Sequence, residues 1–179
     1  VVEATTTTIN DVMGVRRSAL VLINNTFRVP DSVELIVLSS GSTLNNPTAT
    51  GYLSKESPIY RSLSMEKVPV GQFDIEFGPA YQVANDEERA FFRSLGMSAY
   101  VPVMTDSRLI GLLASGPKLN DMPYYGEDFE LLTVIGQQVG TALRSARLID
   151  DLQHLNDSMR VLNKRLENAK MELEKLDTI

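Results

Sequence analysis

Two pairs of adjacent carboxylates, Glu87-Glu88 and Glu127-Asp128, are the residues of this sequence best suited to acid–base chemistry. Paired carboxyl groups can divide the roles of general acid and general base. Each pair, however, stands in the first turn of a segment with helical periodicity, where negative side chains complement the helix dipole. Asn85 precedes Glu88 by three residues, the spacing of a capping box. We therefore interpret both pairs as helix-start signals and predict no catalytic residue and no enzyme activity.

Other groups that commonly carry chemistry are scarce in this chain. Its 179 residues include one histidine, His154, and no cysteine. Without thiols the chain has no thiolate nucleophile and no attachment point for a thioether-linked chromophore. A lone histidine is too few ligands for a metal, and the residues around His154 do not resemble the phosphoacceptor box of a sensor kinase. We expect no metal site and assign His154 to a solvent-exposed helix face.

Charge and hydropathy narrow the expected partners and location. A formal net charge of −6 argues against nonspecific binding to nucleic acid, which depends on a basic surface. No apolar run approaches the ~20 residues that a membrane-spanning helix needs, and no signal peptide is evident. We expect a cytoplasmic protein with no membrane insertion in this segment. The chain begins without methionine and ends within a helical pattern, so we interpret it as a fragment of a longer protein.

The hydrophobic pattern predicts a mixture of helices and strands. Helices are expected where a cap or a stop signal bounds a periodic segment, at residues 1–14, from Ser57-Pro58 onward, and from Asn85 to Leu95. Strands are expected in runs rich in β-branched residues: 18–24, 33–40, 68–70, 98–105 and 109–115. Residues 42–51 are interpreted as loop and 71–84 as irregular.

The last two predicted strands are apolar on both faces, which favours a sheet covered on both sides. Strict alternation would put Leu109 and Leu113 on the face opposite Leu112. The expected fold class is α+β, an antiparallel sheet with helices on both faces.

A single long helix is predicted from about Glu127 to near the C-terminus. From residue 148 its apolar residues are spaced alternately four and three apart: Leu148, Leu152, Leu155, Met159, Leu162, Leu166, Ala169, Leu173 and Leu176. Sustained for about four heptads, this spacing is typical of a coiled coil. A helix packed on its own domain would need a partner surface about 45 Å long at 1.5 Å per residue, more than one small domain offers. We predict that these residues form a homodimer interface. A parallel pair would bring Arg165 near Lys170, so the orientation stays open.

Motifs in the second half of the chain resemble a known family. They are Pro102-Val103, Leu109 to Leu113, Tyr125 to Asp128, Leu131-Leu132, Gln138, Ala142-Leu143 and Ala146 to Leu148. This order is similar to the C-terminal half of a GAF domain, and the likeness covers about Arg89 to Leu152. A PAS-type domain is the alternative, although PAS domains are usually shorter and lack this helix run.

The resemblance implies a sheet with terminal, often dimerising helices on one face and a small-molecule pocket on the other. By resemblance, the pocket is lined by Tyr60, Arg61, Phe73, Tyr81 and Tyr100, with Arg61 as the cation nearest to an anionic ligand. Aromatic residues beside a sheet can equally be core. Family members bind cyclic nucleotides, bilins, haem or metabolites, and many bind nothing, so the function must be argued from the site.

The residues of this chain do not match those that bind the cofactors of the family. A covalent bilin is excluded because the chain has no cysteine. Haem is not expected because His154 lies on the distal helix, outside the domain. The motif of cyclic-nucleotide-binding members cannot be placed. We therefore predict no cofactor.

These expectations combine into a sensory domain at residues 1–147 followed by a coiled-coil linker at 148–179. The leading hypothesis is a regulatory input domain of a signal-transduction protein, a sensor histidine kinase of a two-component system or a cyclic-dinucleotide enzyme. It would dimerise and pass a ligand- or partner-induced change through the long helix to a downstream output domain. The expected partners are a second copy of the chain and an unidentified small molecule. The alternative is an architectural dimerisation module that binds no ligand.

Overall fold

The computed structural model of the chain describes residues 1–25 and 28–178. At its centre is a six-stranded antiparallel sheet with the strand order β3-β2-β1-β6-β5-β4. The strands are β1 (Ser18–Asn25), β2 (Ser32–Leu38), β3 (Ala49–Ser54), β4 (Val70–Gly71), β5 (Ala99–Thr105) and β6 (Arg108–Ser115). β1 and β2 pair along the antiparallel ladder from Leu20–Leu38 to Asn25–Val33, while residues 26 and 27 lie outside the described residues.

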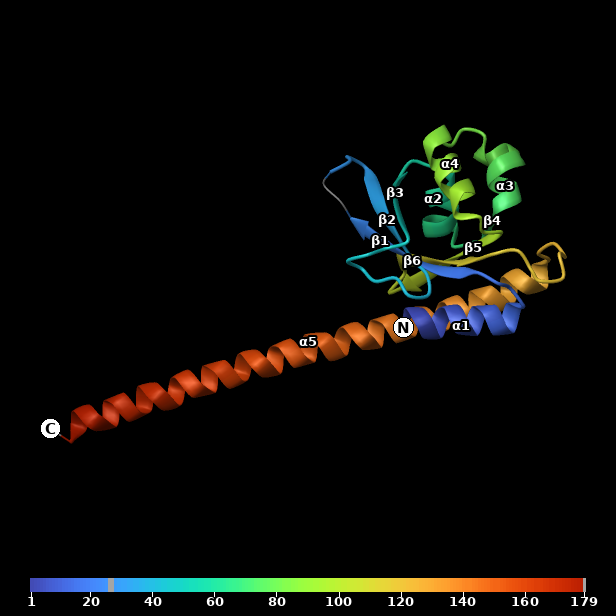
Figure 1. The fold of residues 1–179 in the computed structure, drawn as a ribbon. Helices are drawn as coiled ribbons and strands as arrows, with labels where there is room; N and C mark the ends of the chain where they lie inside the picture. Colours follow the sequence, from blue (N-terminus) through green and yellow to red (C-terminus); the bar gives the residue numbers. More distant parts are fainter. Residues whose placement is uncertain (26–27, 179) are drawn as a thin grey trace. The chain divides into compact units, whose positions relative to one another are not determined.

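Helices cover both faces of this sheet (Figure 1), which confirms the predicted α+β fold class. One face carries α1 (Val2–Met13) and the first part of α5 (Gly126–Asp177). The other face carries α2 (Pro58–Arg61), α3 (Gln72–Phe77) and α4 (Asp86–Leu95), with a π-helical turn at Ser62–Glu66 and a 3-10 turn at Pro79–Tyr81. No described helix is both long enough and apolar enough to cross a lipid bilayer.

The predicted helix ends follow from local capping. The side chain of Ser57 accepts a hydrogen bond from the amide of Ile59 at the start of α2, and that of Asn85 accepts from the amide of Glu87 at the start of α4. Gly14 and Gly96 end α1 and α4 in the left-handed region, with φ of 61° and 62°.

The β5–β6 hairpin shows one departure from the expected alternation. Its turn is Asp106-Ser107, and both residues have positive φ, 49° and 61°, as a two-residue hairpin turn requires. A register shift follows between Val103 and Met104. Such a bulge sets two residues against one and reverses the alternation beyond it. Leu109 therefore packs in the same cluster as Leu112, and the prediction that they face opposite sides is wrong.

Two elements were missed in the sequence because they are short. Residues 49–51, predicted as loop, begin β3, which takes its extended form by pairing with β2 along its whole length. Residues 72–77, predicted as irregular, form α3, a helix of only 6 residues in which no periodicity can be recognised.

Glu88 does not complete the predicted capping box. Its side chain is buried, and Oε1 accepts a hydrogen bond from the amide of Ser54 at 2.8 Å. The carboxylate therefore ties α4 to the end of β3. Phe91, one turn later on the same helix, lies over Gly51, where an added Cβ would come within 2.5 Å of the ring. The partners of Glu88 and Phe91 are both remote in sequence. The spacing from Asn85 therefore predicted the wrong hydrogen-bond partner for Glu88.

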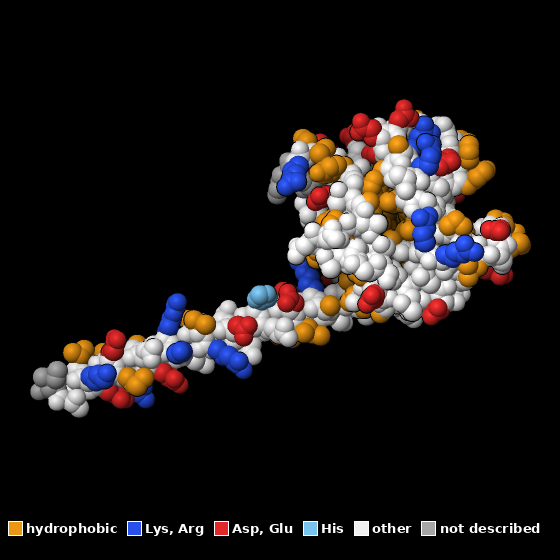
Figure 2. Space-filling view, viewed as in Figure 1, with side chains coloured by type: hydrophobic (Ala, Val, Ile, Leu, Met, Phe, Trp, Pro, Cys, Tyr) orange, Lys and Arg blue, Asp and Glu red, His pale blue; other side chains and the backbone are white. Residues whose placement is uncertain are grey.

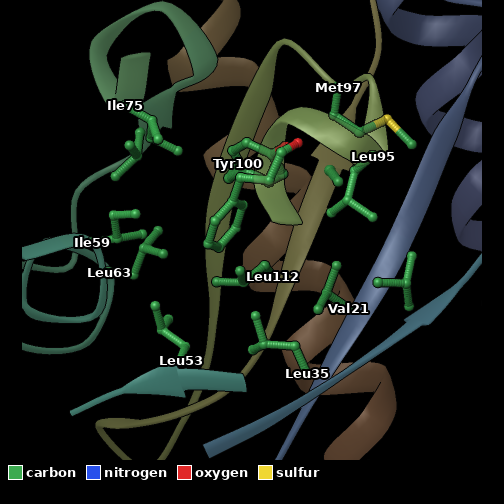
Figure 3. Close-up of a cluster of buried hydrophobic side chains, with 14 of the residues drawn as sticks. Val21, Leu35, Leu53, Ile59, Leu63, Ile75, Leu95, Met97, Tyr100 and Leu112 are labelled. Atoms are coloured by element: carbon green, nitrogen blue, oxygen red, sulfur yellow. The ribbon is translucent and has the colours of Figure 1, made fainter. Parts of the chain in front are cut away.

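The main hydrophobic core lies between the sheet and helices α2 to α4. Figure 3 shows Leu53, Ile59 and Leu63 pointing toward Tyr100 and Leu112 from different elements. All five side chains are fully buried. On the opposite face, Leu132, Ile135 and Val139 of α5 are buried against the sheet.

The chain divides into two compact units, Val1–Thr141 and Ala142–Ile179. Helix α5 begins in the first unit and continues into the second. Its 52 residues confirm the predicted long helix. The functional boundary predicted between residues 147 and 148 stays a prediction.

Helix α5 approaches β5 closely at two glycines. A Cβ on Gly140 would lie 2.5 Å from the carbonyl oxygen of Met104, and one on Gly136 would lie 3.3 Å from that of Pro102. A strand carbonyl is backbone, so it cannot move aside as the tip of a side chain can. These glycines therefore set the distance between helix and sheet.

We expect Gly140→Ala to lower the free energy of unfolding by about 2 kcal/mol, because α5 must move away from β5. Elsewhere in a helix the same change usually stabilises by about 0.5–1 kcal/mol. Gly126→Ala is the matched control, since an added Cβ there meets nothing within 4 Å. Urea unfolding of both variants measures the difference. Equal stability of the two would contradict the close-approach argument.

Candidate functional site

Three of the five residues predicted to line a pocket surround the main core. Tyr100 is fully buried within it, and the half-buried Tyr60 and Tyr81 pack against it. Arg61 is exposed at the end of α2. Phe73 is 73% exposed on α3, where its ring lies 5.0 Å from that of Phe77. The structure thus brings the three tyrosines to one cluster and separates Phe73 from it.

Tyr100 is held by polar contacts from two helices. Its hydroxyl donates to the carbonyl oxygen of Phe92 at 3.0 Å and lies 3.1 Å from Oε1 of Gln72. Its ring packs edge-on against that of Phe92, with centroids 4.9 Å apart. Burial, and then the negative charge of Glu76, raise the pKa of the Tyr100 phenol well above its usual value. This hydroxyl is therefore a fixed hydrogen-bond donor.

Tyr81 closes another part of the same cluster. Its hydroxyl donates to Oγ of Ser62 at 3.0 Å, and Ser62 begins the π-helical turn after α2. π-Helical segments frequently occur at functional sites. In this chain the turn ends at Lys67, which adopts the left-handed conformation with φ of 56°.

Two cavities lie instead along the connector, residues 116–125 between β6 and α5. Their volumes are about 530 Å³ and about 460 Å³, and both are lined by Pro117, Lys118 and Asp121. Phe73 lines the larger of the two. No predicted pocket residue lies in this segment. Its available signal was a lysine between proline and aromatic residues, directly before a predicted helix.

Lys118 joins the connector to the start of α5. Its Nζ lies 2.7 Å from Oδ2 of Asp128, and this pair is largely buried, with side chains 13% and 20% exposed. The same carboxylate oxygen accepts the amide of Tyr125 at 2.7 Å. Nζ also lies 5.4 Å from the centre of the Tyr124 ring, within the range of a cation–π contact.

The pKa of Asp128 reflects these contacts. Burial acts to raise it, but the hydrogen bonds from Lys118 and the Tyr125 amide, together with the Lys118 charge, outweigh burial and place the pKa below its ordinary value. The two acidic residues in the first turn of α5 include Asp128, as predicted from the helix dipole. Asp128 has the additional role of fixing the connector.

Tyr124 anchors the other end of the connector to the sheet. Its hydroxyl lies 2.6 Å from the carbonyl oxygen of Gly116 and 2.7 Å from Oγ of Ser115. Burial, the largest influence, raises the pKa of Tyr124. The connector is thus a structured segment: Tyr124 near its end bonds back to Ser115 of β6, and Lys118 near its beginning pairs with Asp128 of α5.

The remaining candidates are placed plainly by the structure. His154 is exposed on α5, with Nε2 3.8 Å from Asp150. Glu87 is exposed in the first turn of α4. Among the described residues no group of three or more His, Cys, Asp or Glu side chains could hold a metal ion.

Every side chain of α5 from Arg144 to Asp177 is exposed within the single chain, including those of the predicted dimer interface. Figure 2 shows hydrophobic side chains between acidic and basic ones along this helix. The predicted interface comprises Leu148, Leu152, Leu155, Met159, Leu162, Leu166, Ala169, Leu173 and Leu176. Among its leucines the exposed fraction runs from 53% at Leu148 to 67% at Leu166 and Leu176.

No protein-family model and no curated protein matches the sequence. Solved structures with a similar fold include the GAF domain/HD domain protein from Geobacter sulfurreducens, 11% identical over 83% of this chain and 93% of that chain, with a TM-score of 0.58. The GAF domain of a phosphoenolpyruvate-protein phosphotransferase from Coxiella burnetii is 13% identical over 84% of each chain, with a TM-score of 0.54. The GAF domain of a two-component sensor histidine kinase from Bacillus halodurans is 14% identical over 83% of this chain and 94% of that chain, with a TM-score of 0.52. These likenesses confirm the predicted GAF-like fold.

We expect Asp128→Asn to lower the free energy of unfolding at pH 7 by about 1 kcal/mol, because Lys118 loses a charged partner in a largely buried place. The pKa of Asp128 is lowered in the folded state. Its charge therefore contributes stability above the ordinary carboxyl pKa, and this contribution disappears as the pH falls through the folded pKa.

The difference between wild type and variant should accordingly shrink as the pH falls below the ordinary carboxyl pKa and vanish once Asp128 is protonated in the folded state. Thermal unfolding between pH 2 and pH 8 measures it. Asp121→Asn is the control, since Asp121 lies on the same connector and forms no ion pair among the described residues. A difference that persists unchanged in acid would show that the Asp128 charge is not responsible.

Proposed function

Because the chain has the fold of a GAF domain, we propose that it is a regulatory input domain of a signal-transduction protein. It dimerises through the second half of α5 and passes a change in its first unit to a downstream output domain. It acts by binding and carries out no catalysis, and it works in the cytoplasm. A sensor histidine kinase or a cyclic-dinucleotide enzyme is the proposed kind of output, and the similar GAF domain of a two-component sensor histidine kinase supports the first.

The observation that carries this proposal is that the two halves of α5 have different surroundings. Its first turns are packed on β5 through Gly136 and Gly140 and bonded to the connector through Asp128. Its later turns expose an apolar residue every three or four positions, with no partner surface among the described residues. Exposed leucines in heptad spacing are stabilised when they pack against the same residues of a second helix. One helix thus belongs both to the folded core and to a dimer interface.

A signal reaches the downstream domain when two arrangements of α5 have different affinities for ligand or partner. The structural elements able to bias α5 are those that contact it, β5 and the connector among them. A change at either would alter how the first turns of α5 pack, and the helix would transmit that change along its length.

A second candidate function is an architectural dimerisation module that binds no ligand. The observation in its favour is the filled core around Tyr100, where Leu53, Ile59, Leu63 and Leu112 occupy the space between sheet and helices (Figure 3). Both candidates require the dimer. They differ in whether a small molecule binds the first unit.

The dimer is tested with two neighbouring substitutions on α5. Leu162 lies on the heptad seam and Val161 beside it, and their exposed fractions are nearly equal, 56% and 52%. We expect Leu162→Lys to weaken dimerisation by at least tenfold, about 1.4 kcal/mol, because it places a charge in the seam. Val161→Lys should leave the dimer unchanged, and sedimentation equilibrium measures both.

Truncation after Leu148 provides the second arm of this test. The shortened chain should sediment as a monomer at micromolar concentration while the intact chain sediments as a dimer. If both chains sediment as monomers, the heptad residues after Leu148 do not form a dimer interface. Equal effects of the two lysine substitutions would show that the dimer, if present, uses another surface.

A further inference from the structure

The two connector cavities adjoin each other because the same three residues, Pro117, Lys118 and Asp121, line both. The smaller cavity is completed by Arg16 and Arg17 from the segment between α1 and β1. The larger extends toward α3, the start of β5 and the first turn of α5. In Figure 2, basic side chains lie beside hydrophobic ones at the end of the domain where Figure 1 places the connector.

Positive charge predominates in the smaller cavity. Three cationic side chains line it, those of Arg16, Arg17 and Lys118, against the carboxylate of Asp121 in its lining and that of Asp128, which pairs with Lys118. Neither arginine forms an ion pair with any carboxylate in residues 1–25 and 28–178. The excess is local, since the whole chain carries a formal net charge of −6. A concave surface of this kind attracts small anions.

Arg17 is fixed in place before any ligand binds. Its Nη2 donates to the carbonyl oxygen of Gly96 at 2.7 Å, a neutral partner that leaves the guanidinium charge unbalanced. Gly96 has a φ of 62°, and a side chain there would overlap the guanidinium. The carbonyl oxygen of Arg17 accepts the amide of Gly116 at 2.8 Å, which ties its backbone to the start of the connector. A cation held this way loses little entropy when it binds an anion.

Lys118 is brought to the arginines by the backbone. Val15 and Lys118 form an antiparallel bridge, and the amide of Leu119 donates to the carbonyl oxygen of Gly14 at 2.8 Å. The connector therefore runs beside the α1–β1 segment. Three cations from two remote parts of the sequence line one cavity as a result.

The larger cavity supplies a different chemistry. Its lining includes the aromatic rings of Phe73, Tyr124 and Phe129 and the side chain of Met97. Binding sites for small molecules commonly combine apolar walls with a few charged groups that fix the orientation of the ligand. The larger cavity also has the carboxylates of Asp74 and Asp121 in its lining, and Lys118 lines both cavities.

We propose that the two cavities form one binding site for a small molecule that joins a phosphate or carboxylate group to an apolar or aromatic body. The anionic group binds beside Arg16 and Arg17, whose forked N–H donors match either kind of oxyanion. The body lies against Tyr124 and Phe129. The three tyrosines of the core cluster do not line this site, and its biological role rests on the proposed regulatory function.

The site lies next to the contact that joins the connector to α5. A bound anion competes with the carboxylate of Asp128 for the ammonium of Lys118, because one cation cannot fully satisfy both. Ligand binding would then weaken the Lys118–Asp128 pair, which is 2.7 Å long in this structure. Occupation of the groove is thereby linked to the packing of the first turn of α5.

Calorimetric titration of the full chain with four probes tests the site: phenyl phosphate, inorganic phosphate, benzoate and acetate. Phenyl phosphate should bind about tenfold more tightly than inorganic phosphate, and benzoate more tightly than acetate, because the ring enters the apolar cavity. The tighter of phenyl phosphate and benzoate identifies the preferred anionic group. The double variant Arg16→Gln/Arg17→Gln should lose at least about tenfold in affinity for it.

The matched control is Lys55→Gln/Lys67→Gln, which removes the same charge at exposed positions that line neither cavity. Its affinity should stay within about twofold of wild type, since exposed distant charges are screened by salt. Asp128→Asn should instead bind several-fold more tightly, because it releases Lys118. Circular dichroism of each variant confirms that it is folded before titration.

Absence of binding by all four probes at millimolar concentration would overturn the site. So would equal losses in the two double variants, since that outcome indicates general attraction by charge. A chain that sediments as a dimer but binds no probe overturns this inference and leaves the dimer standing. A monomeric chain that binds phenyl phosphate overturns the proposed dimerisation and leaves the site standing.

Discussion

The close approach of α5 to β5 is the constraint on which the rest of the first unit depends. Gly136 and Gly140 allow the helix to lie against strand carbonyls, and this places Leu132, Ile135 and Val139 where they are buried against the sheet. The connector must then span a fixed distance from the end of β6 to the start of α5. Its bonds at Gly116 and Asp128 hold it across that distance.

The sequence predicts the elements whose causes are local. Gly14 ends a helix and Asn85 begins one through contacts within a few residues, and the heptad spacing after Leu148 marks the apolar stripe of α5 without any knowledge of the fold. The predicted pocket residues rested on the family resemblance, which indicates where a segment lies but not where each side chain points. Of that set, Tyr100 lies in the core and Phe73 on the surface.

Features with remote causes could not be predicted in the same way. Glu88 fits a capping box in sequence, yet its partner is the amide of Ser54, which only the fold brings near. The basic groove is a second example, since Arg17 and Lys118 become neighbours through the pairing of β1 with β6. Neither residue carries a motif. They matter because the strand pairing brings their positive charges together at one end of the sheet.

The strand order also has a consequence for how the domain folds. β1, β2 and β3 form one meander and β5 and β6 one hairpin, and both units pair strands that are close in sequence. Only the β1–β6 ladder, from Ser18–Ser115 to Leu22–Gly111, joins them across the helices between. That step must close the longest loop, so it is expected to limit the folding rate. Loop-closure entropy grows slowly, by about 0.6 kcal/mol for each doubling of length, so the loops between α2 and α4 can change in length at little entropic cost to this step.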